Sequence, residues 1–187
     1  MYFENQTFEN QNYTTQPLLV WEYENCIFQE CNFSHSSISQ IQFVDCEFLS
    51  CNLTMIETFA TKLQNVRFVE SKLLWVELKN CNEFLFEVSF IKSNLELASF
   101  SGMKIKNTSF EYCDLKEVNF TGADCSGVNF SHSNLTWALF QRTKLEKAIF
   151  QNAYNYVLDP EENTLSGAQF SLEWLPGLLT KYHITIY

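Results

Sequence analysis

Large apolar residues recur every five positions along most of this chain. In the C-terminal half they fall at Leu95, Phe100, Ile105, Phe110, Leu115, Phe120, Phe130, Leu135, Phe140, Leu145 and Phe150. Small residues lie two positions before these centres, as at Cys113, Val118, Ala123, Val128, Ser133, Ala138, Thr143 and Ala148. A helix buries residues with a period of about 3.6 and a strand with a period of 2. A period of five fits neither, so the pattern predicts an internal repeat.

The same register extends toward the N-terminus, with one slip of two residues within 79–90. Before the slip the centres fall at Phe3, Phe8, Tyr13, Leu18, Tyr23, Phe28, Phe33, Ile38, Phe43, Phe48, Leu53, Thr58, Leu63, Phe68, Leu73 and Leu78. Every phenylalanine except Phe59, Phe84 and Phe86 lies on a centre. We therefore expect a core built on the centres Phe28, Phe33, Phe43, Phe48, Phe110, Phe120, Phe130, Phe140 and Phe150.

Many individual repeats carry the same short motif, for example "CNFSH" (31–35), "CNLTM" (51–55), "CDLKE" (113–117), "VNFSH" (128–132) and "SNLTW" (133–137). Over roughly residues 3–155 the chain resembles the pentapeptide-repeat proteins. The resemblance implies an all-β fold, a right-handed quadrilateral parallel β-helix in which four pentapeptides make one square coil. Centre and small residues would point inward, and each coil would be stabilised only by its neighbours.

The repeat decays after Phe150, and the tail has a different pattern. We expect a division into a pentapeptide-repeat β-helix (1–155) and a C-terminal capping and dimerisation module (156–187). Ser171 is a candidate N-cap for a short helix over 172–179, which Pro176 limits. The alternation in 183–187 predicts a short terminal strand.

The tail is rich in apolar residues that could form either an end cap or a two-fold dimer interface, and we favour the dimer. The candidate interface residues are Trp174, Leu175, Leu178, Leu179, Tyr182, Ile184 and Ile186. From Asn155 to Ile186 the tail is similar to the C-terminal module of the Qnr-type quinolone-resistance proteins. That resemblance rests on Asn155, Tyr156, Asp159, Pro160, Asn163, Leu165, Gly167, Ala168, Phe170, Ser171, Leu172, Gly177, Leu178, Leu179, Ile184 and Ile186.

The Qnr-type resemblance implies a homodimer that binds DNA gyrase or topoisomerase IV by mimicking duplex DNA and protects the enzyme from fluoroquinolones. Many Qnr-type proteins carry long projecting loops, whereas the slip at 79–90 is too small for such a loop. The resemblance therefore implies topoisomerase binding more firmly than drug protection.

Acidic residues concentrate near the N-terminus. The net charge is −10, and residues 1–61 contain eight acids and no Lys or Arg. Counting sides in fours places Glu4, Glu22, Glu24 and Asp45 on a first side. The candidate partner-binding surface consists of Glu4, Glu9, Glu22, Glu24, Glu30, Asp45, Glu47 and Glu70. One interpretation of this charge is solubility, and the other is an anionic surface offered to a DNA-binding protein.

The cysteines and histidines do not suggest catalysis or metal binding. Cys26, Cys31, Cys46, Cys51, Cys81 and Cys113 occupy the small inward column and Cys125 a centre, which predicts buried thiols. His35 and His132 fall on outward corners, and no catalytic motif is present. We expect no enzyme activity, no cofactor, no metal and no direct contact with nucleic acid.

Targeting signals are equally sparse. No run of 18 apolar residues exists and the N-terminus lacks a basic region, so we expect a cytoplasmic protein without a membrane span. The alternative to a topoisomerase-binding protein is a non-catalytic scaffold for another partner.

Overall fold

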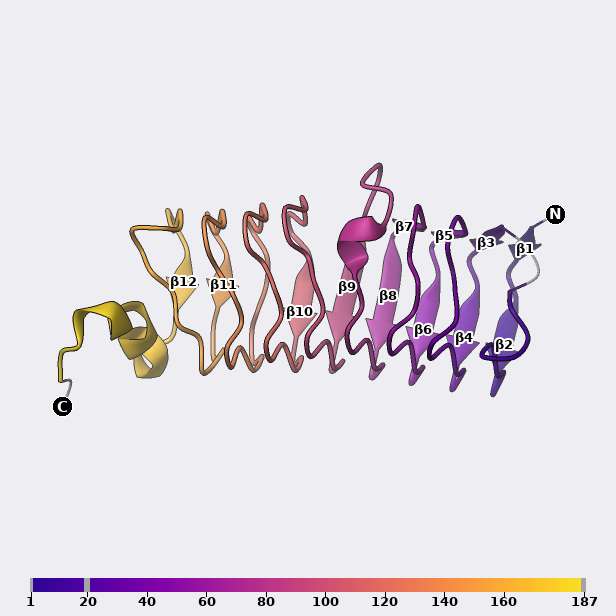
Figure 1. Cartoon of the computed structure of the whole chain (residues 1–187), viewed down its shortest axis with the longest axis horizontal. Coiled ribbons are helices and arrows are strands. Elements are labelled where there is room, and N and C mark those ends of the chain that lie inside the picture. The colour runs from indigo at the N-terminus through magenta and orange to yellow at the C-terminus, as the bar shows by residue number, and fades with distance from the viewer. Residues whose placement is uncertain (1, 19–20, 186–187) are drawn as a thin grey trace.

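Short parallel strands stacked along one axis form a rod in the computed structural model, which describes residues 2–18 and 21–185 (Figure 1). The strands are β1 (Phe3–Glu4), β2 (Thr7–Glu9), β3 (Glu22–Glu24), β4 (Ile27–Gln29), β5 (Gln42–Val44), β6 (Glu47–Leu49), β7 (Lys62–Gln64), β8 (Val66–Val69), β9 (Val88–Ile91), β10 (Ser109–Glu111), β11 (Ile149–Phe150) and β12 (Gln169–Phe170). Three short 3₁₀ helices complete the elements: η1 (Leu78–Asn80), η2 (Leu172–Leu178) and η3 (Thr180–Tyr182). The architecture is a parallel β-solenoid, as the resemblance to the pentapeptide-repeat proteins implies.

The rod has four sides, which we number in chain order. Side 1 is the sheet β1-β3-β5-β7, and side 2 contains β2-β4-β6-β8-β9-β10 and, farther along, β11-β12. Side 3 is a ladder of single bridges at Asn12, Asn32, Asn52, Lys72, Asn94, Asp114, Asn134 and Tyr154. Side 4 pairs Ser37 with Glu57, and then Glu77, Ser99, Asn119 and Leu139 in succession. Most partners are 20 residues apart, so one coil is four pentapeptides.

The centres fill the axis of the rod. The nine phenylalanines expected as core centres are all buried. On side 2, rings stack in one continuous column: the ring centroids of Phe28 and Phe48 are 4.8 Å apart, and those of Phe130 and Phe150 are 4.9 Å apart. Rings on side 4 meet this column edge-on. The ring centroids of Phe120 and Phe110, for example, are 5.7 Å apart. Stacked and edge-to-face pairs are both favourable geometries for aromatic rings.

The small inward residues connect successive coils through hydrogen bonds. The Cys51 thiol donates to the Phe28 carbonyl at 3.2 Å, and the hydroxyls of Ser71 and Thr143 donate to Phe48 and Phe120 at 3.0 and 2.9 Å. All seven cysteines are buried and free. A small residue with a single donor therefore adds a hydrogen bond between successive coils without enlarging the core.

Corners are made by residues in the left-handed backbone region. Positive φ values recur at the last position of the repeat, as at Asn25 (49°), Asp45 (51°) and His132 (62°). The side chain before the centre often completes the turn, and the Asn32 Oδ1 atom accepts from the Ser34 N–H at 3.1 Å. This local bond is the usual Asx turn.

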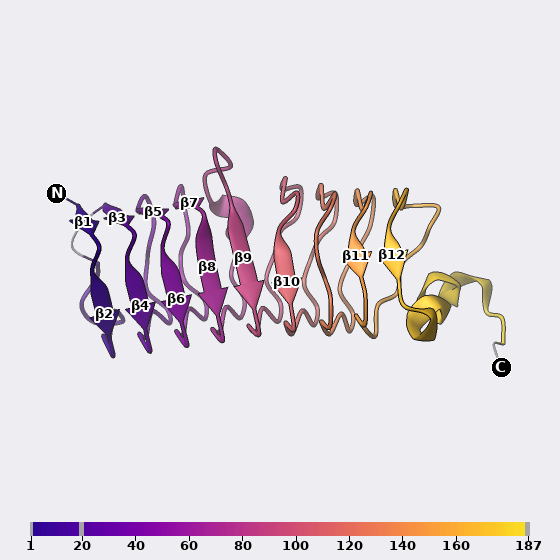
Figure 2. The ribbon, with the colours of Figure 1, turned by 180° about the vertical axis from the view of Figure 1, so that it is seen from behind.

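The predicted slip is absorbed on side 1, within a single coil. Val66 pairs with Val88 and Phe68 with Phe90, a spacing of 22 residues in place of 20. The two extra residues make a short loop over 83–87 that projects from the rod beside η1 (Figures 1 and 2). Phe84 is 72% exposed at this loop, whereas Phe86 packs against the core. The slip thus makes a small projection, and not the long loop that the sequence predicts it is too small to form.

The tail departs from the prediction in two ways. Residues 184 and 185 have no regular structure, so the terminal strand expected over 183–187 is wrong for its described part. His183, at φ 52°, ends η3 in the left-handed region, which breaks an extended path. Ser171 stands at the N-cap of η2, but its hydroxyl accepts from the Asn152 N–H at 2.7 Å instead of a helix N–H. With Pro176 inside it, η2 is a 3₁₀ helix. The division of the chain at 155 stays a prediction, because β12 still pairs with β11.

Truncation of a core ring tests the inward register. We expect Phe120→Ala to lower the free energy of unfolding by about 3–5 kcal/mol, because it empties a fully buried position. Phe59, which is 66% exposed, is the matched control, and Phe59→Ala should change stability by less than about 0.5 kcal/mol. Urea unfolding monitored by circular dichroism measures both, and equal effects of the two changes would contradict the assigned register.

Candidate partner-binding surface

Unpaired carboxylates crowd the first coils of side 1. The register places Glu4 directly beside Glu24, and Glu22 beside Gln42. Adjacent parallel strands lie about 4.8 Å apart, so Glu4 and Glu24 repel one another across the surface. The Gln42 amide donates to the Glu22 carboxylate at 3.1 Å, and the Asn65 amide donates to Asp45 at 2.6 Å. Amides orient these carboxylates but leave their charge in place.

Side 2 carries the other predicted acids, and here bases begin to appear. Glu47 forms an ion pair of 2.6 Å with Arg67, and Glu70 one of 3.3 Å with Lys92. Both pairs join neighbouring coils. Glu47 and Glu70 are therefore partly neutralised within the protein itself.

The eight predicted acids thus divide into two groups. Within residues 2–18 and 21–185, six have no salt bridge: Glu4, Glu9, Glu22, Glu24, Glu30 and Asp45. They all lie on the first three coils of sides 1 and 2, or on the corner after each. We call these six residues the acidic end.

Farther along side 1, Asp124 is neutralised by two lysines. Asp124 lies 3.3 Å from the Lys106 ammonium and 4.0 Å from that of Lys144. Burial opposes ionisation of Asp124, but hydrogen bonds from Ser126 and the Lys106 charge outweigh it and lower its pKa. Most of the excess negative charge therefore lies in residues 1–61, which contain eight acids and no Lys or Arg.

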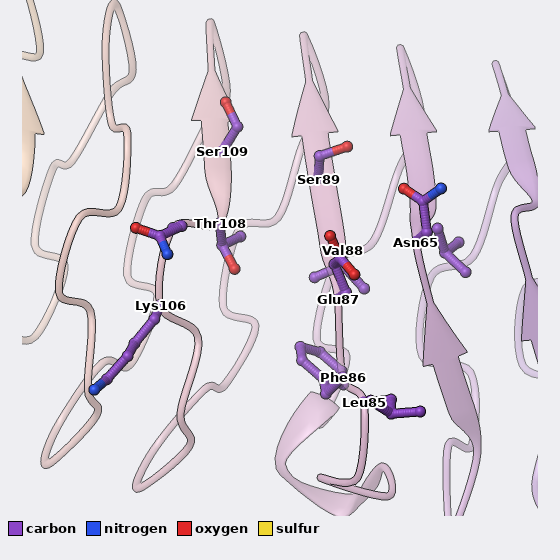
Figure 3. A pocket seen from close by; sticks show the side chains of 11 residues that line it. Asn65, Leu85, Phe86, Glu87, Val88, Ser89, Lys106, Thr108 and Ser109 are labelled. Carbon is purple, nitrogen blue, oxygen red and sulfur yellow. The ribbon is translucent and has the colours of Figure 1, made fainter.

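The inserted loop interrupts side 1 between these two regions. Side 1 is a sheet up to β7 and continues as single bridges from Lys104. A pocket of about 390 Å³ opens beside the loop and is lined by residues including Asn65, Phe86 and Lys106. Figure 3 shows Ser89 and Ser109 on neighbouring strands above it, with Leu85 and Phe86 near η1. The pocket separates the acidic end from the neutralised coils.

The tail is fixed to the last coil by close contacts. Gly177 passes the Tyr156 carbonyl so closely that an added Cβ would lie 2.2 Å from this oxygen, and the Leu158 N–H donates to the Gly177 carbonyl at 3.1 Å. Burial raises the pKa of Tyr156 to about 12, and its hydroxyl is the one buried side-chain N or O atom without a hydrogen-bond partner among the described residues. A glycine is required where η2 crosses the solenoid.

The predicted dimer residues have two different environments. Trp174 and Leu178 are half-buried and pack against the core, which makes them a cap of the open coil. In contrast, Leu179, Tyr182 and Ile184 are exposed by 37%, 51% and 56%. Leu175 is half-buried, and Ile186 lies outside the described residues. The exposed group is available for a second surface.

Some exposed apolar residues were not singled out from the sequence. Phe84 projects on the loop, and Trp75 and Trp137 stand on one corner of the rod, exposed by 52% and 69%. The sequence does distinguish the two tryptophans, because they lie outside the centre column in a chain that places most of its aromatic residues on centres.

The pentapeptide-repeat family model matches residues 71–150. This segment of the chain is therefore a pentapeptide-repeat region. Among solved structures, a trypsin-treated variant of QnrB1, a plasmid-mediated fluoroquinolone resistance protein, is similar at 18% identity and a TM-score of 0.52, covering 100% of this chain and 98% of that one. This likeness shows the shared fold.

Two further solved structures are more distant in shape. Full-length QnrB1 has 15% identity and a TM-score of 0.47, covering 98% of this chain and 100% of that one. HetL, a pentapeptide-repeat protein involved in heterocyst differentiation regulation in the cyanobacterium Nostoc, has 15% identity and a TM-score of 0.39, covering 90% and 85%. No curated protein sequence matches the chain.

A pH-dependent ion cluster holds the tail. Lys181 pairs with Asp159 at 2.6 Å and with Glu161 at 2.8 Å. The hydrogen bond from Lys181 is the largest cause of the lowered pKa of both carboxyls. Because the folded-state pKa values are depressed, this contribution is present above the unfolded values of about 4 and is lost as the pH falls through the folded ones.

We therefore expect Lys181→Met to speed amide exchange in residues 171–185 at pH 7 by a few-fold at most, because exposed ion pairs are weak. As the pH is lowered toward 2.5, the difference between variant and parent should shrink, because the two carboxyls become protonated. Hydrogen–deuterium exchange with mass spectrometry measures both, and a difference that persists in acid would show that the Lys181 stem, and not its charge, fixes the tail.

Proposed function

We propose that this protein binds DNA gyrase or topoisomerase IV through its acidic end, which replaces a segment of duplex DNA, and that it thereby modulates the response of the enzyme to fluoroquinolones. The observation that carries the proposal is the set of six carboxylates without salt bridges on two adjacent sides of three successive coils. The proposed mechanism is binding without catalysis, in the cytoplasm where the topoisomerase acts.

The charge density of the acidic end supports this proposal. Three coils at about 4.8 Å each span about 14 Å. Duplex DNA carries one negative charge per about 1.7 Å, or about eight charges over that length. The first three coils carry seven acids on sides 1 and 2 when Glu47 is included with the six. Lysines and arginines that normally bind phosphates would meet carboxylates at a similar density.

The length of the rod is also appropriate. Eight coil steps separate Phe8 from Phe170, which is about 38 Å at the usual strand spacing. Two rods joined through their tails would reach about 80–90 Å, which equals about 25 base-pair steps of 3.4 Å. The similarity of the fold to QnrB1, a fluoroquinolone resistance protein, is consistent with this function.

Neutral substitutions in the acidic end should weaken topoisomerase binding. We expect the triple change Glu4→Gln, Glu24→Gln and Glu30→Gln to lower the affinity for gyrase about tenfold, at about 0.5 kcal/mol for each exposed charge. Its matched control removes the same charge from exposed acids elsewhere, with Glu83→Gln, Glu162→Gln and Glu173→Gln. Displacement of fluorescent DNA from gyrase measures the affinity, and binding of the parent should fall steeply with salt.

The same proteins should then be titrated into a gyrase supercoiling reaction with and without ciprofloxacin. Recovery of supercoiling in the presence of drug would indicate protection, and inhibition alone would indicate a DNA mimic without protection. Absence of any effect, together with no displacement of DNA, would contradict the proposed function and favour a scaffold for another partner.

We also propose that the exposed apolar face of the tail, formed by Leu179, Tyr182 and Ile184, joins two copies about a two-fold axis. Leu179→Glu combined with Ile184→Glu should give a monomer in sedimentation equilibrium, because charge would be buried at the centre of the interface. Phe84→Glu, at an equally exposed apolar position, should leave the dimer intact. A dimer that survives the double change would place the interface elsewhere.

A further inference from the structure

Large apolar side chains occupy the left-handed corner between sides 3 and 4. The corner residues of five successive coils are Met55, Trp75, Leu97, Glu117 and Trp137, with φ values from 53° to 63°. Their backbone N–H groups connect coil to coil, as Trp75 donates to the Glu96 carbonyl and Leu97 to that of Lys116, both at 3.0 Å. The four steps from Met55 to Trp137 cover about 19 Å.

These residues do not serve the fold at this position. A side chain in the left-handed region costs free energy unless it is Gly, Asn or Asp, and most other corners of this chain carry polar residues or glycine. Met55, Trp75 and Trp137 are exposed by 44%, 52% and 69%, so burial does not compensate for the cost. Residues that violate a local preference without a packing benefit indicate a functional surface.

The corner forms one wall of a groove along side 4. A hollow of about 520 Å³ lies between Trp75, Leu97 and Trp137 on one side and the short side chains of Ser99 and Asn119 on the other. A second hollow of about 310 Å³ continues it past Trp75 to Met55 and Phe59. Leu139 adds a further exposed apolar residue at the far end.

The groove carries more negative than positive charge. Glu57, Glu77 and Glu117 line the two hollows, whereas the one base in their lining is Lys79, which is held by Glu77 at 3.0 Å. Lys116, just outside, binds Glu96 at 2.7 Å, lies 3.7 Å from the Glu117 carboxylate and places its ammonium 5.7 Å from the centre of the Trp137 ring. An indole face in this groove therefore already accepts a cation, which is the expected attraction of ammonium for an aromatic ring.

We propose that this groove binds a basic amphipathic helix of a protein partner, with apolar side chains against Trp75, Leu97 and Trp137. Its Lys or Arg would lie toward Glu57, the one acid of the lining without a salt bridge in the described part of the chain. The three coil steps between the two tryptophans cover about 14 Å, the length of about ten helical residues. Anchors at i, i+3 or i+4, and i+7 would lie along the groove. A second copy of this chain, itself acidic at −10, lacks the complementary charge.

The proposal is independent of topoisomerase binding, because the groove lies on side 4 and its adjacent corner, whereas the acidic end occupies sides 1 and 2. Its test uses a synthetic 14-residue helical peptide with leucines on one face and lysines on the other. Two control peptides have glutamate in place of lysine, or the same composition in scrambled order.

The protein variant for this test is Trp75→Asn with Trp137→Asn. Asparagine suits the left-handed corner, so the variant should fold with a melting temperature equal to or above that of the parent. Tyr112→Asn is the matched control, because Tyr112 is an exposed aromatic residue in the left-handed region at another corner, with a φ of 57°.

We expect the Leu/Lys peptide to bind the parent and the Tyr112→Asn variant alike in isothermal titration calorimetry, and the double variant at least tenfold more weakly. The glutamate peptide should not bind. Equal binding by the double variant, or by the scrambled peptide, would overturn the proposal and leave only general attraction to an acidic protein. Self-association of the parent that the double variant loses would equally overturn it, by making a second copy the occupant.

Discussion

Coil-on-coil stacking is the interaction on which every other feature of this protein depends. Each backbone segment hydrogen bonds to the same segment one coil earlier and one coil later, and each side-2 ring stacks on its counterpart at about the distance that separates adjacent strands. A coil buries its core only against the neighbouring coils. The first and last coils each lack one neighbour, so each leaves apolar core residues uncovered on one face. The C-terminal end is capped by Trp174 and Leu178, whereas Phe3, Phe8 and Tyr13 stay half-buried beside an apolar hollow of about 420 Å³ at the other end.

Stacking also determines how charge and apolar surface are distributed. A residue at one position of the repeat lies directly beside the residue one coil away, so similar residues 20 positions apart become a stripe on one side. Glu4 and Glu24 form the beginning of an acidic stripe, and Trp75 and Leu97 belong to an apolar one on another side. The protein can therefore present chemically distinct surfaces that share no residues, each held by a rigid frame.

Much of this arrangement could be predicted from the sequence. The spacing of the phenylalanines gives the five-residue repeat and the inward positions, and the family resemblance implies the coil of four repeats that assigns each residue to a side. The two-residue slip at 79–90 was visible as well, but the path of the extra residues was not, since Phe84 and Phe86 are alike in sequence and only one of them enters the core. The tail was predicted less well. Pro176 lies inside the 3₁₀ helix η2, and His183 ends η3 in the left-handed backbone region. The alternation of apolar residues in the sequence does not reveal either conformation.

The candidate surface was predicted only as a set of acids. Whether an acid is neutralised depends on the residue beside it in the next coil. Glu47, for example, is paired with Arg67. The exposed tryptophans could not be predicted as a surface, because the repeat pattern specifies which positions point inward and says nothing about which outward positions are apolar.

No helix within residues 2–18 and 21–185 has the length and hydropathy needed to span a membrane.

The loop over 83–87 has a consequence for how such a protein can change over evolution. It lengthens one coil from 20 to 22 residues, yet Phe68 still stacks on Phe90 and the sides beyond it keep their alignment. This loop therefore uncouples chain length from the geometry of the rod. Further insertions at the same place could extend outward and leave the acidic and aromatic stripes aligned as they are. The loop is thus the natural place for a new binding loop to arise.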